Sequence, residues 1–327
     1  MDRWSGVLKI QLHPNSTTCY RVAASLCLSS SRNLSVPSGN AIFFNGDRVE
    51  GTGNPVIERL SDPQKIAEIL VSKFGGSINA FVVEASIFDG PFAVYKDFIP
   101  SVNEYGDPKS YDATGFPAST TLVQLLSKFL AEAKTVIPGK QKQPYQAEAS
   151  PSFSGKPEMA LLGFSKGGTV LNQLLTEFAF SEIKSMEIPV KANNSTVNEG
   201  LSINIDDWII PTTKEDLFNS IAEIHYVDVG LNTKGAYLTD SDVIDRISDN
   251  ICQRRSGIRF LLHGTPRQWF DERRVWIRKE KDALLRLLKR AAHKNMGKLR
   301  IRERLYFPGK PSDLQMHFEI IDIMDVS

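Results

Sequence analysis

The sequence predicts an α/β protein with a mostly parallel, eight-stranded sheet and helices on both faces. Two observations favour this fold class. Short apolar runs such as 41–44 (AIFF) suit strands that are buried on both faces. Amphipathic stretches of helical length separate these runs, and this alternation is typical of parallel sheets. Because no internal repeat or linker interrupts the pattern, residues 1–327 are expected to form a single domain.

The first two strands are expected to form an antiparallel hairpin. Residues 7–13 alternate apolar and polar side chains, and 19–28 provide a second run after a His-Pro-Asn-Ser turn. The first helix is expected to have Ser61 as its N-cap and to end at Gly75. The same patterns predict strands at 41–44, 79–85, 159–162, 224–229, 257–262 and 299–307, and helices at 62–74, 119–134, 167–180, 241–252, 271–292 and 314–324.

Two polar stretches do not fit the alternation of strands and helices. Residues 139–157 are rich in Gln, Pro, Ser and Ala, and 191–207 are polar with scattered apolar side chains. Loops of this length are uncommon inside a compact domain unless they serve a function. We expect both stretches to be surface insertions, and the glycine-rich stretch 50–55 to be a shorter loop.

Composition and charge narrow the classes of function. The 39 basic and 38 acidic residues give a formal net charge of +1, so neither a nucleic-acid partner nor an acidic tail is expected. Cys19, Cys27 and Cys252 are too few for a disulfide framework and are not spaced like a zinc site. No cofactor, metal or transmembrane segment is expected. These features favour the cytoplasm, with the mitochondrion as the alternative because the run 27–32 is rich in serine.

One motif carries most of the chemistry. Residues 163–167 (GFSKG) fit the pattern G-x-S-x-G, between the apolar run 159–162 and the helical stretch that includes Thr169. A strand, a sharp turn and a helix in this order are typical of a nucleophile elbow. Glycines permit the tight crossing, and the helix N-terminus places N–H groups near the reacting oxygen. We therefore predict that Ser165 is a nucleophile in strained backbone geometry.

A serine nucleophile needs a general base, and the chain offers five histidines. In a fold of this kind the base follows the last strand, because only that loop reaches the turn at the serine. His317 meets this condition. The other four histidines all precede the last predicted strand: His13, His225, His263 and His293. Elimination therefore favours His317 as the base.

The third member of a catalytic triad would be an acid that orients the histidine. Asp228 closes the strand at 224–229, whereas Asp271 follows the strand at 257–262. Asp271 can also be read as a first-turn charge of the next helix. Asp228 is slightly favoured and Asp271 is the alternative acid. One of the two, not both, is expected to contact the His317 ring.

An oxyanion hole would need two backbone N–H donors. Lys166, directly after the serine, would provide one of them. The other would come from Gly46 or Asp47, in the turn after the third strand. The His-Gly-Gly sequence found at this place in many hydrolases is absent, so the second donor has less support than the first.

A basic segment extends from Arg273 to Arg304. Leucines at 284, 285, 287 and 288 give it an apolar face, which indicates an amphipathic helix with solvated basic side chains. The alternative is a surface for an acidic partner or a membrane lipid.

The elbow, the order of elements and the late histidine together resemble the α/β-hydrolase superfamily, over most of the chain. The pieces 163–168, 263–266 with 276–277, and 315–318 are more narrowly similar to a eukaryotic family of hydrolase-like proteins. The resemblance implies a fold like that of esterases and lipases, and animal members of that family are associated with mitochondria and energy metabolism. That family has no established substrate, so the resemblance implies an architecture more than a reaction.

Two functions are consistent with these features. The first is a serine hydrolase that cleaves an ester or thioester through an acyl-enzyme on Ser165. His317 would move the proton, and an aspartate would fix its tautomer. The second is a non-catalytic, hydrolase-like scaffold. The expected ligand is accordingly a small acyl substrate or a protein partner.

Overall fold

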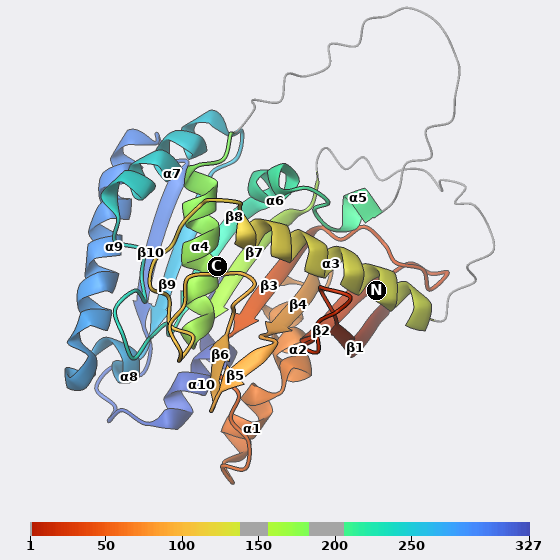
Figure 1. Ribbon diagram of the computed structural model, residues 1–327, viewed down its shortest axis with the longest axis horizontal. Coiled ribbons are helices and arrows are strands. Elements are labelled where there is room, and N and C mark those ends of the chain that lie inside the picture. The colour runs from red at the N-terminus through yellow and green to blue at the C-terminus, as the bar shows by residue number, and fades with distance from the viewer. Residues whose placement is uncertain (1, 138–155, 183–205) are drawn as a thin grey trace, which may run out of the picture.

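The computed structural model describes residues 2–137, 156–182 and 206–327 of the chain. Eight of the strands form one sheet in the order β1-β2-β4-β3-β7-β8-β9-β10 (Figure 1). β1 pairs with β2, and β2 with β4, in antiparallel register, whereas all other neighbours in this sheet are parallel. The predicted fold class, a mostly parallel eight-stranded sheet that begins with a hairpin, is therefore confirmed.

The elements of the described residues follow the alternation expected from the sequence. The strands of the large sheet are β1 (Asp2–Ile10), β2 (Tyr20–Leu28), β3 (Gly39–Asn45), β4 (Asn79–Glu84), β7 (Glu158–Phe164), β8 (Ile221–Val227), β9 (Ile258–Gly264) and β10 (Leu299–Leu305). A separate small hairpin consists of β5 (Ile87–Asp89) and β6 (Phe92–Val94). The helices are α1 (Pro55–Ser61), α2 (Pro63–Phe74), α3 (Pro117–Val136), α4 (Gly168–Ala179), α5 (Asp206–Ile209), α6 (Lys214–Ser220), α7 (Ser241–Gln253), α8 (Pro266–Trp269), α9 (Val275–Lys294) and α10 (Leu314–Ile323).

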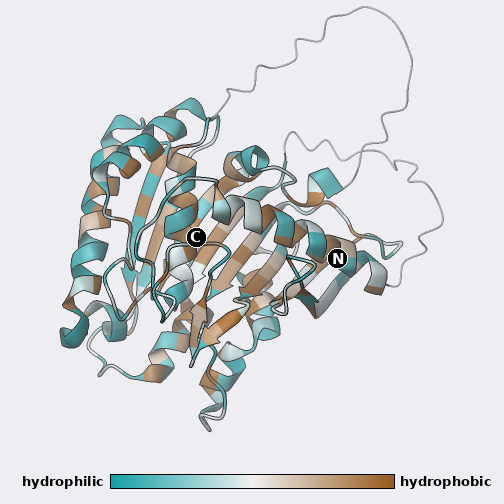
Figure 2. Cartoon of the chain, in the orientation of Figure 1, coloured by the Kyte–Doolittle hydropathy of each residue, from teal (hydrophilic) through white to brown (hydrophobic). Residues whose placement is uncertain are grey.

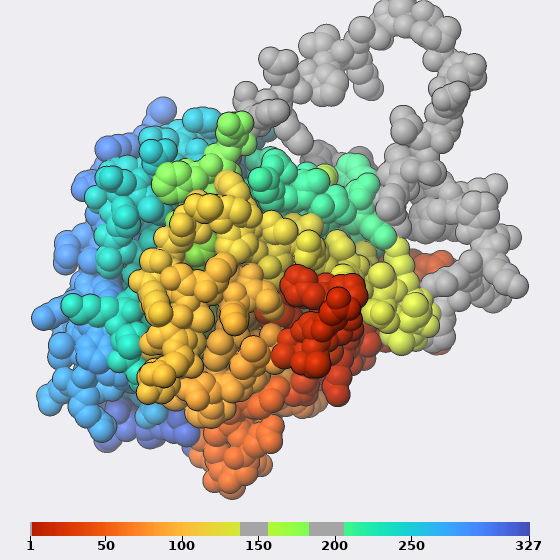
Figure 3. All heavy atoms as spheres, viewed as in Figure 1, coloured from red at the N-terminus to blue at the C-terminus, as the bar shows by residue number. Residues whose placement is uncertain are grey.

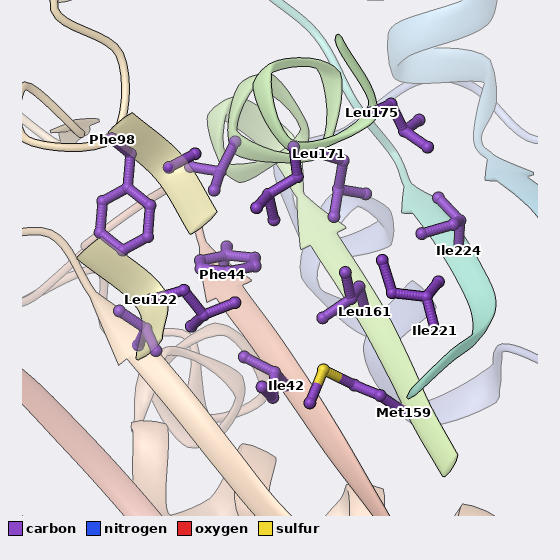
Figure 4. Close-up of a cluster of buried hydrophobic side chains, with 14 of the residues drawn as sticks. Ile42, Phe44, Phe98, Leu122, Met159, Leu161, Leu171, Leu175, Ile221 and Ile224 are labelled. Carbon is purple, nitrogen blue, oxygen red and sulfur yellow. The ribbon is translucent and has the colours of Figure 1, made fainter. Parts of the chain in front are cut away.

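Alternate residues of the central strands enter two different apolar cores. Ile42 and Phe44 of β3 belong to the larger core, whereas Ala41 and Phe43 belong to the core on the opposite face. Successive side chains of a strand point to opposite faces, so a strand buried on both faces needs a continuous apolar run. Figure 4 shows Ile42 and Phe44 in the larger core, together with Leu171 of α4.

Helices cover both faces of the sheet, as predicted. Buried side chains of α3, α4, α7 and α9 line the larger core, and those of α1, α2 and α10 line the other. The central strands are largely brown in Figure 2, whereas the outer sides of α7 and α9 are largely teal, so each helix turns its apolar side to the sheet. The parallel strands end at one edge of the sheet, where the loops that follow them can meet.

The helix α1 was not predicted, and the cap of the helix that follows it differs from the prediction. The loop predicted at 50–55 ends earlier, because Asn54 caps α1 by accepting hydrogen bonds from two backbone N–H groups. Ser61 is the last residue of α1, so its prediction as the next N-cap is wrong. Asp62 takes that place and accepts from Gln64 N at 2.8 Å, with Pro63 at the first helical position. Proline suits this position because its missing N–H would have no partner there.

The long helix predicted over 271–292 begins later than expected. Asp271 caps a short 3₁₀ turn, Glu272–Arg274, and α9 starts at Val275. The predicted amphipathic character of the basic segment is confirmed, because Ile277, Leu284 and Leu288 are buried while most basic side chains of α9 are not. Its suggested role as a surface for an acidic partner stays a prediction.

Some parts of the chain were not predicted or are not described. The hairpin β5–β6 was missed because strands of three residues are too short to show a pattern. The segment between β4 and α3, orange to yellow in Figure 3, forms part of the viewed surface. The insertions predicted at 139–157 and 191–207 fall almost wholly outside the described residues. Within the described helices, none is long and apolar enough to cross a membrane.

Candidate functional site

Ser165 lies at a sharp turn between β7 and α4, as predicted. Its φ of +50° is in the left-handed region, which a serine rarely adopts. The neighbouring glycines are needed for space: a Cβ on Gly167 would lie 2.0 Å from Phe44 O, and one on Gly163 would lie 2.7 Å from Gly168 Cα. The turn therefore presents the serine where the strand and helix cross too closely for larger residues.

Ser165 opens into a cavity of about 370 Å³. Ser165, Lys166, Asp47 and His317 all line this cavity, so the structure brings together the predicted nucleophile, base and turn residues. The cavity is within the size range of small-molecule sites. The remaining walls are partly apolar and partly basic, with Val49, Pro91, Phe92, Leu231, Leu314, Arg267 and Arg274 among them.

Asp228 is the aspartate that contacts the predicted base. Its Oδ2 lies 2.6 Å from His317 Nδ1, and both side chains are buried. Thr265 fixes the carboxylate by donating from its backbone N–H at 2.7 Å and from its hydroxyl at 2.9 Å. The alternative acid, Asp271, instead accepts a hydrogen bond from Arg274 Nε at 2.8 Å. The expectation that one of the two aspartates, not both, contacts the ring is therefore met.

The other ring nitrogen of His317 contacts a second aspartate, which the sequence did not predict. Asp47 Oδ2 lies 2.8 Å from His317 Nε2, and the Asp47 side chain is also buried. In a serine–histidine–aspartate triad this nitrogen faces the serine hydroxyl. Among the described residues, no hydrogen bond joins Ser165 to His317. We call Asp47, His317 and Asp228 the carboxylate clamp.

The carboxylate clamp favours the charged form of the histidine. Burial alone would lower the pKa of His317, but the hydrogen bonds and negative charges of Asp228 and Asp47 outweigh it and raise the pKa to about 9. His317 is therefore an imidazolium at neutral pH, donating from both nitrogens. In this state it has no free lone pair with which to take a proton from Ser165.

Two other histidines form a separate buried chain of hydrogen bonds. His225 Nε2 lies 2.8 Å from Glu223 Oε2, and its Nδ1 lies 3.2 Å from His263 Nε2. His263 Nδ1 lies 3.0 Å from the Tyr306 hydroxyl. Neither histidine lines the cavity at Ser165, which agrees with the elimination that favoured His317.

The turn after β3 is held against the elbow by the small hairpin. Gly46 O accepts from Ala93 N at 2.9 Å, and Arg48 N donates to Pro91 O at 2.7 Å. Asp47 stands opposite Phe92 between these two bonds, so its own N–H points away from β6. The role of oxyanion donor that was suggested for Asp47 or Gly46 alongside Lys166 stays a prediction.

We expect Gly46→Ala to be strongly destabilising. An added Cβ would lie 2.2 Å from Phe164 O and 2.3 Å from Lys166 N, and backbone atoms cannot yield as a flexible side chain can. Overpacking of this kind costs about 1–3 kcal/mol or more. Urea unfolding should show a clearly lower midpoint than for Gly76→Ala, where an added Cβ meets nothing within 4 Å. Equal midpoints for the two variants would contradict this account of the turn.

The Lys166 side chain is a site feature that the sequence did not reveal. Its ammonium group is buried, lies 3.0 Å from Asp107 Oδ1 and donates to Tyr105 O at 2.5 Å. Lys166, which follows the predicted nucleophile, is therefore ion-paired with Asp107 in the segment between β6 and α3. Within the described residues, no cluster of His, Cys, Asp and Glu side chains could hold a metal ion.

The strand order and the serine elbow define the class to which this protein belongs. The sheet begins with an antiparallel hairpin, crosses through β4-β3-β7, and carries the serine after β7 and the histidine after β10. This is the α/β-hydrolase fold. The predicted resemblance to that superfamily is therefore confirmed at the level of the fold.

Comparison with known sequences gives a narrower relationship. The family described as C2orf69 matches residues 132–294. The chain is also 21% identical over 304 residues to the "Mitochondrial protein C2orf69 homolog" of Danio rerio, covering 90% of this chain and 76% of the relative. The predicted similarity to a hydrolase-like family with mitochondrial animal members is thus confirmed. The name of the Danio protein agrees with the alternative location, and the location of this chain stays a prediction.

Several solved structures are similar to this one over nearly their full length. The BES protein from Bacillus cereus has a TM-score of 0.45 and 12% identity, with 97% of this chain and 95% of the other covered. The siderophore hydrolase EstA from Aspergillus nidulans has a TM-score of 0.44 and 14% identity, with coverage of 96% and 91%.

Proposed function

We propose that this protein is a serine hydrolase that cleaves an ester or thioester through an acyl-enzyme on Ser165. One observation carries the proposal: Ser165, on a strained elbow, and His317, oriented by Asp228, open into the same cavity. A serine, a histidine and a buried aspartate in this chain order are the groups that acyl transfer needs. Lys166 N–H and Asp47 N–H would support the oxyanion.

The proposed reaction has two steps. Neutral His317 takes the Ser165 hydroxyl proton on Nε2 while Oγ bonds to the acyl carbon, and the C=O electron pair moves onto oxygen. The intermediate then expels an alcohol or thiol, which receives that proton from His317. Water attacks the acyl-serine in the same way, and release of the carboxylic acid restores Ser165.

The carboxylate clamp must open for this reaction. The described contacts represent a resting state, in which Nε2 donates to Asp47. Loss of the Nε2 proton replaces this hydrogen bond with a lone pair facing a carboxylate, which is repulsive. We therefore propose that deprotonation of His317 releases Asp47 and makes Nε2 available to Ser165. Apo enzymes often show looser or incomplete catalytic hydrogen bonds, so the resting geometry is compatible with a hydrolase.

A second candidate function is the non-catalytic scaffold. The contact between His317 Nε2 and Asp47 favours it, because a ring held on both sides by carboxylates is a stable structural element. In that case the elbow and cavity would be inherited architecture, and the ligand would be a protein partner.

Covalent labelling with a fluorophosphonate probe separates the two candidates. If Ser165 is a nucleophile, the peptide that contains it should gain the probe mass, more rapidly at pH 9 than at pH 6.5. The Ser165→Ala variant should gain none there, and Ser110→Ala, an exposed serine outside the cavity, should label like wild type. Absence of an adduct on Ser165 at both pH values, in wild type and in Asp47→Asn, would reject the hydrolase proposal in favour of the scaffold.

A further inference from the structure

Arg267 is a basic side chain in the wall of the Ser165 cavity that has no acidic partner. It is half-buried in α8, and no carboxylate of the described residues lies within 4.0 Å of its guanidinium group. The other cations of the cavity are paired: Lys166 with Asp107, Arg274 with Asp271, and His317 with both of its aspartates. Of the basic side chains that line this cavity in the described residues, Arg267 is therefore the one without a neighbouring carboxylate.

The residue after Arg267 lies in the same wall of the cavity. Gln268 also lines the cavity and is 96% buried, yet its Oε1 has no hydrogen-bond partner among the described residues. A buried amide group without a partner is costly, and such groups are normally satisfied by protein, water or ligand. That oxygen is an acceptor packed against Gly230 and cannot bind an anion, so Arg267 supplies the anion-binding group of this wall.

The Arg267 guanidinium group fits a particular chemical class of substrate. A guanidinium group binds carboxylate and phosphate through paired, charge-assisted hydrogen bonds, and it stays charged at all relevant pH values. Val49, Leu231 and Leu314 provide apolar walls in the same cavity, which suit a short hydrocarbon chain. A ligand with an anionic end, an apolar stretch and a cleavable acyl group would match all three features.

We propose that the cavity binds an ester or thioester that carries a carboxylate or phosphate group away from the bond that is cleaved, with Arg267 holding that anion. This inference rests on the hydrolase proposal for the cleavage step, but the anion site itself does not depend on catalysis. It assigns α8 to substrate selection and the elbow to chemistry.

A matched pair of esters tests the selection. We expect wild type to prefer 4-nitrophenyl hydrogen adipate, which ends in a carboxylate, over 4-nitrophenyl hexanoate, which does not. In Arg267→Gln the kcat/KM for the adipate ester should fall about 10- to 100-fold more than that for the hexanoate ester, as loss of a charged hydrogen bond implies. Arg267→Lys should recover part of the preference. Arg273→Gln is the control, because that side chain is 95% exposed and lies outside the cavity.

A binding measurement makes the two proposals separable. Adipate and butyl phosphate are titrated calorimetrically into the Ser165→Ala variant and into the double variant Ser165→Ala/Arg267→Gln. The ligand that binds Ser165→Ala more tightly identifies the preferred anion. Weaker anion binding without Arg267 supports the site, even if neither ester is cleaved and the hydrolase proposal fails. Ser165-dependent cleavage of both esters, with Arg267→Gln affecting them equally and anion binding unchanged, overturns the anion site and leaves the hydrolase standing.

Discussion

Under the hydrolase proposal, removing Ser165 or His317 is expected to abolish hydrolysis to nearly the same extent as removing both. A serine hydroxyl is a poor nucleophile until a base takes its proton. Without Ser165, His317 has no hydroxyl proton to take. Groups that act as a unit are strongly non-additive, and each single change should lower kcat by about 10⁴-fold or more. Rates with an activated ester at pH 9, where much of His317 is neutral, give the clearest comparison.

The controls for these single and double variants test whether the protein still folds. His317→Ala leaves the two carboxylates of the clamp buried without their shared cation, so His317→Gln is measured beside it, because a neutral amide can still donate to one of them. His293→Ala and Ser110→Ala replace an exposed histidine and an exposed serine away from the cavity and should leave the rate unchanged. Independent, additive losses from Ser165→Ala and His317→Ala would show that the two residues do not act as a pair.

The fold was predictable because its signals are local. The run 41–44 needs no distant partner to indicate a strand buried on both faces, and the glycines around Ser165 mark a turn that larger residues cannot make. Chain order then placed the histidine after the last strand. Boundaries were less accurate where two signals compete, as at Ser61 and Asp62, where both can cap a helix but only Asp62 precedes a proline.

The contacts of His317 with two carboxylates were not predictable, because they depend on side chains brought together from distant elements. Asp228 and His317 are 89 positions apart, and Asp47 and His317 are 270 apart. Sequence order could place all three near one sheet edge. It could not show that Asp47 would turn its carboxylate to the histidine, since the turn that carries Asp47 is fixed by the short hairpin β5–β6, which has no sequence pattern.

Under the hydrolase proposal, replacing Asp47 with asparagine is expected to make hydrolysis faster at neutral pH. With a pKa of about 9, only about one His317 in a hundred is neutral at pH 7. Asparagine keeps the size of the side chain but removes one of the two negative charges beside the ring. Loss of an opposite charge at hydrogen-bond distance should move the rising limb of the pH–rate profile down by about 1–3 pH units. The rate at pH 7 should then rise about tenfold or more.

The same substitution has a consequence for stability that is measured without any substrate. The folded-state pKa of His317 lies above its ordinary value of 6.5, so protonation stabilises the fold. This stabilisation is complete below about pH 6.5 and is lost as the pH rises through about 9, by roughly 3 kcal/mol in all. In Asp47→Asn the loss should be smaller and should end at a lower pH.

Both effects follow from the carboxylate clamp, so they should appear together. The pH–rate profile and the urea midpoints from pH 6 to pH 10 are measured for wild type, Asp47→Asn and Asp47→Ala, the last because an asparagine amide can still donate to a neutral Nε2. If Asp47 restrains the base, both variants shift the profile and the stability curve toward acid. A uniform drop in rate at every pH, with the midpoints of the profile unchanged, would instead mean that the Asp47 carboxylate takes part in the reaction and does not restrain His317.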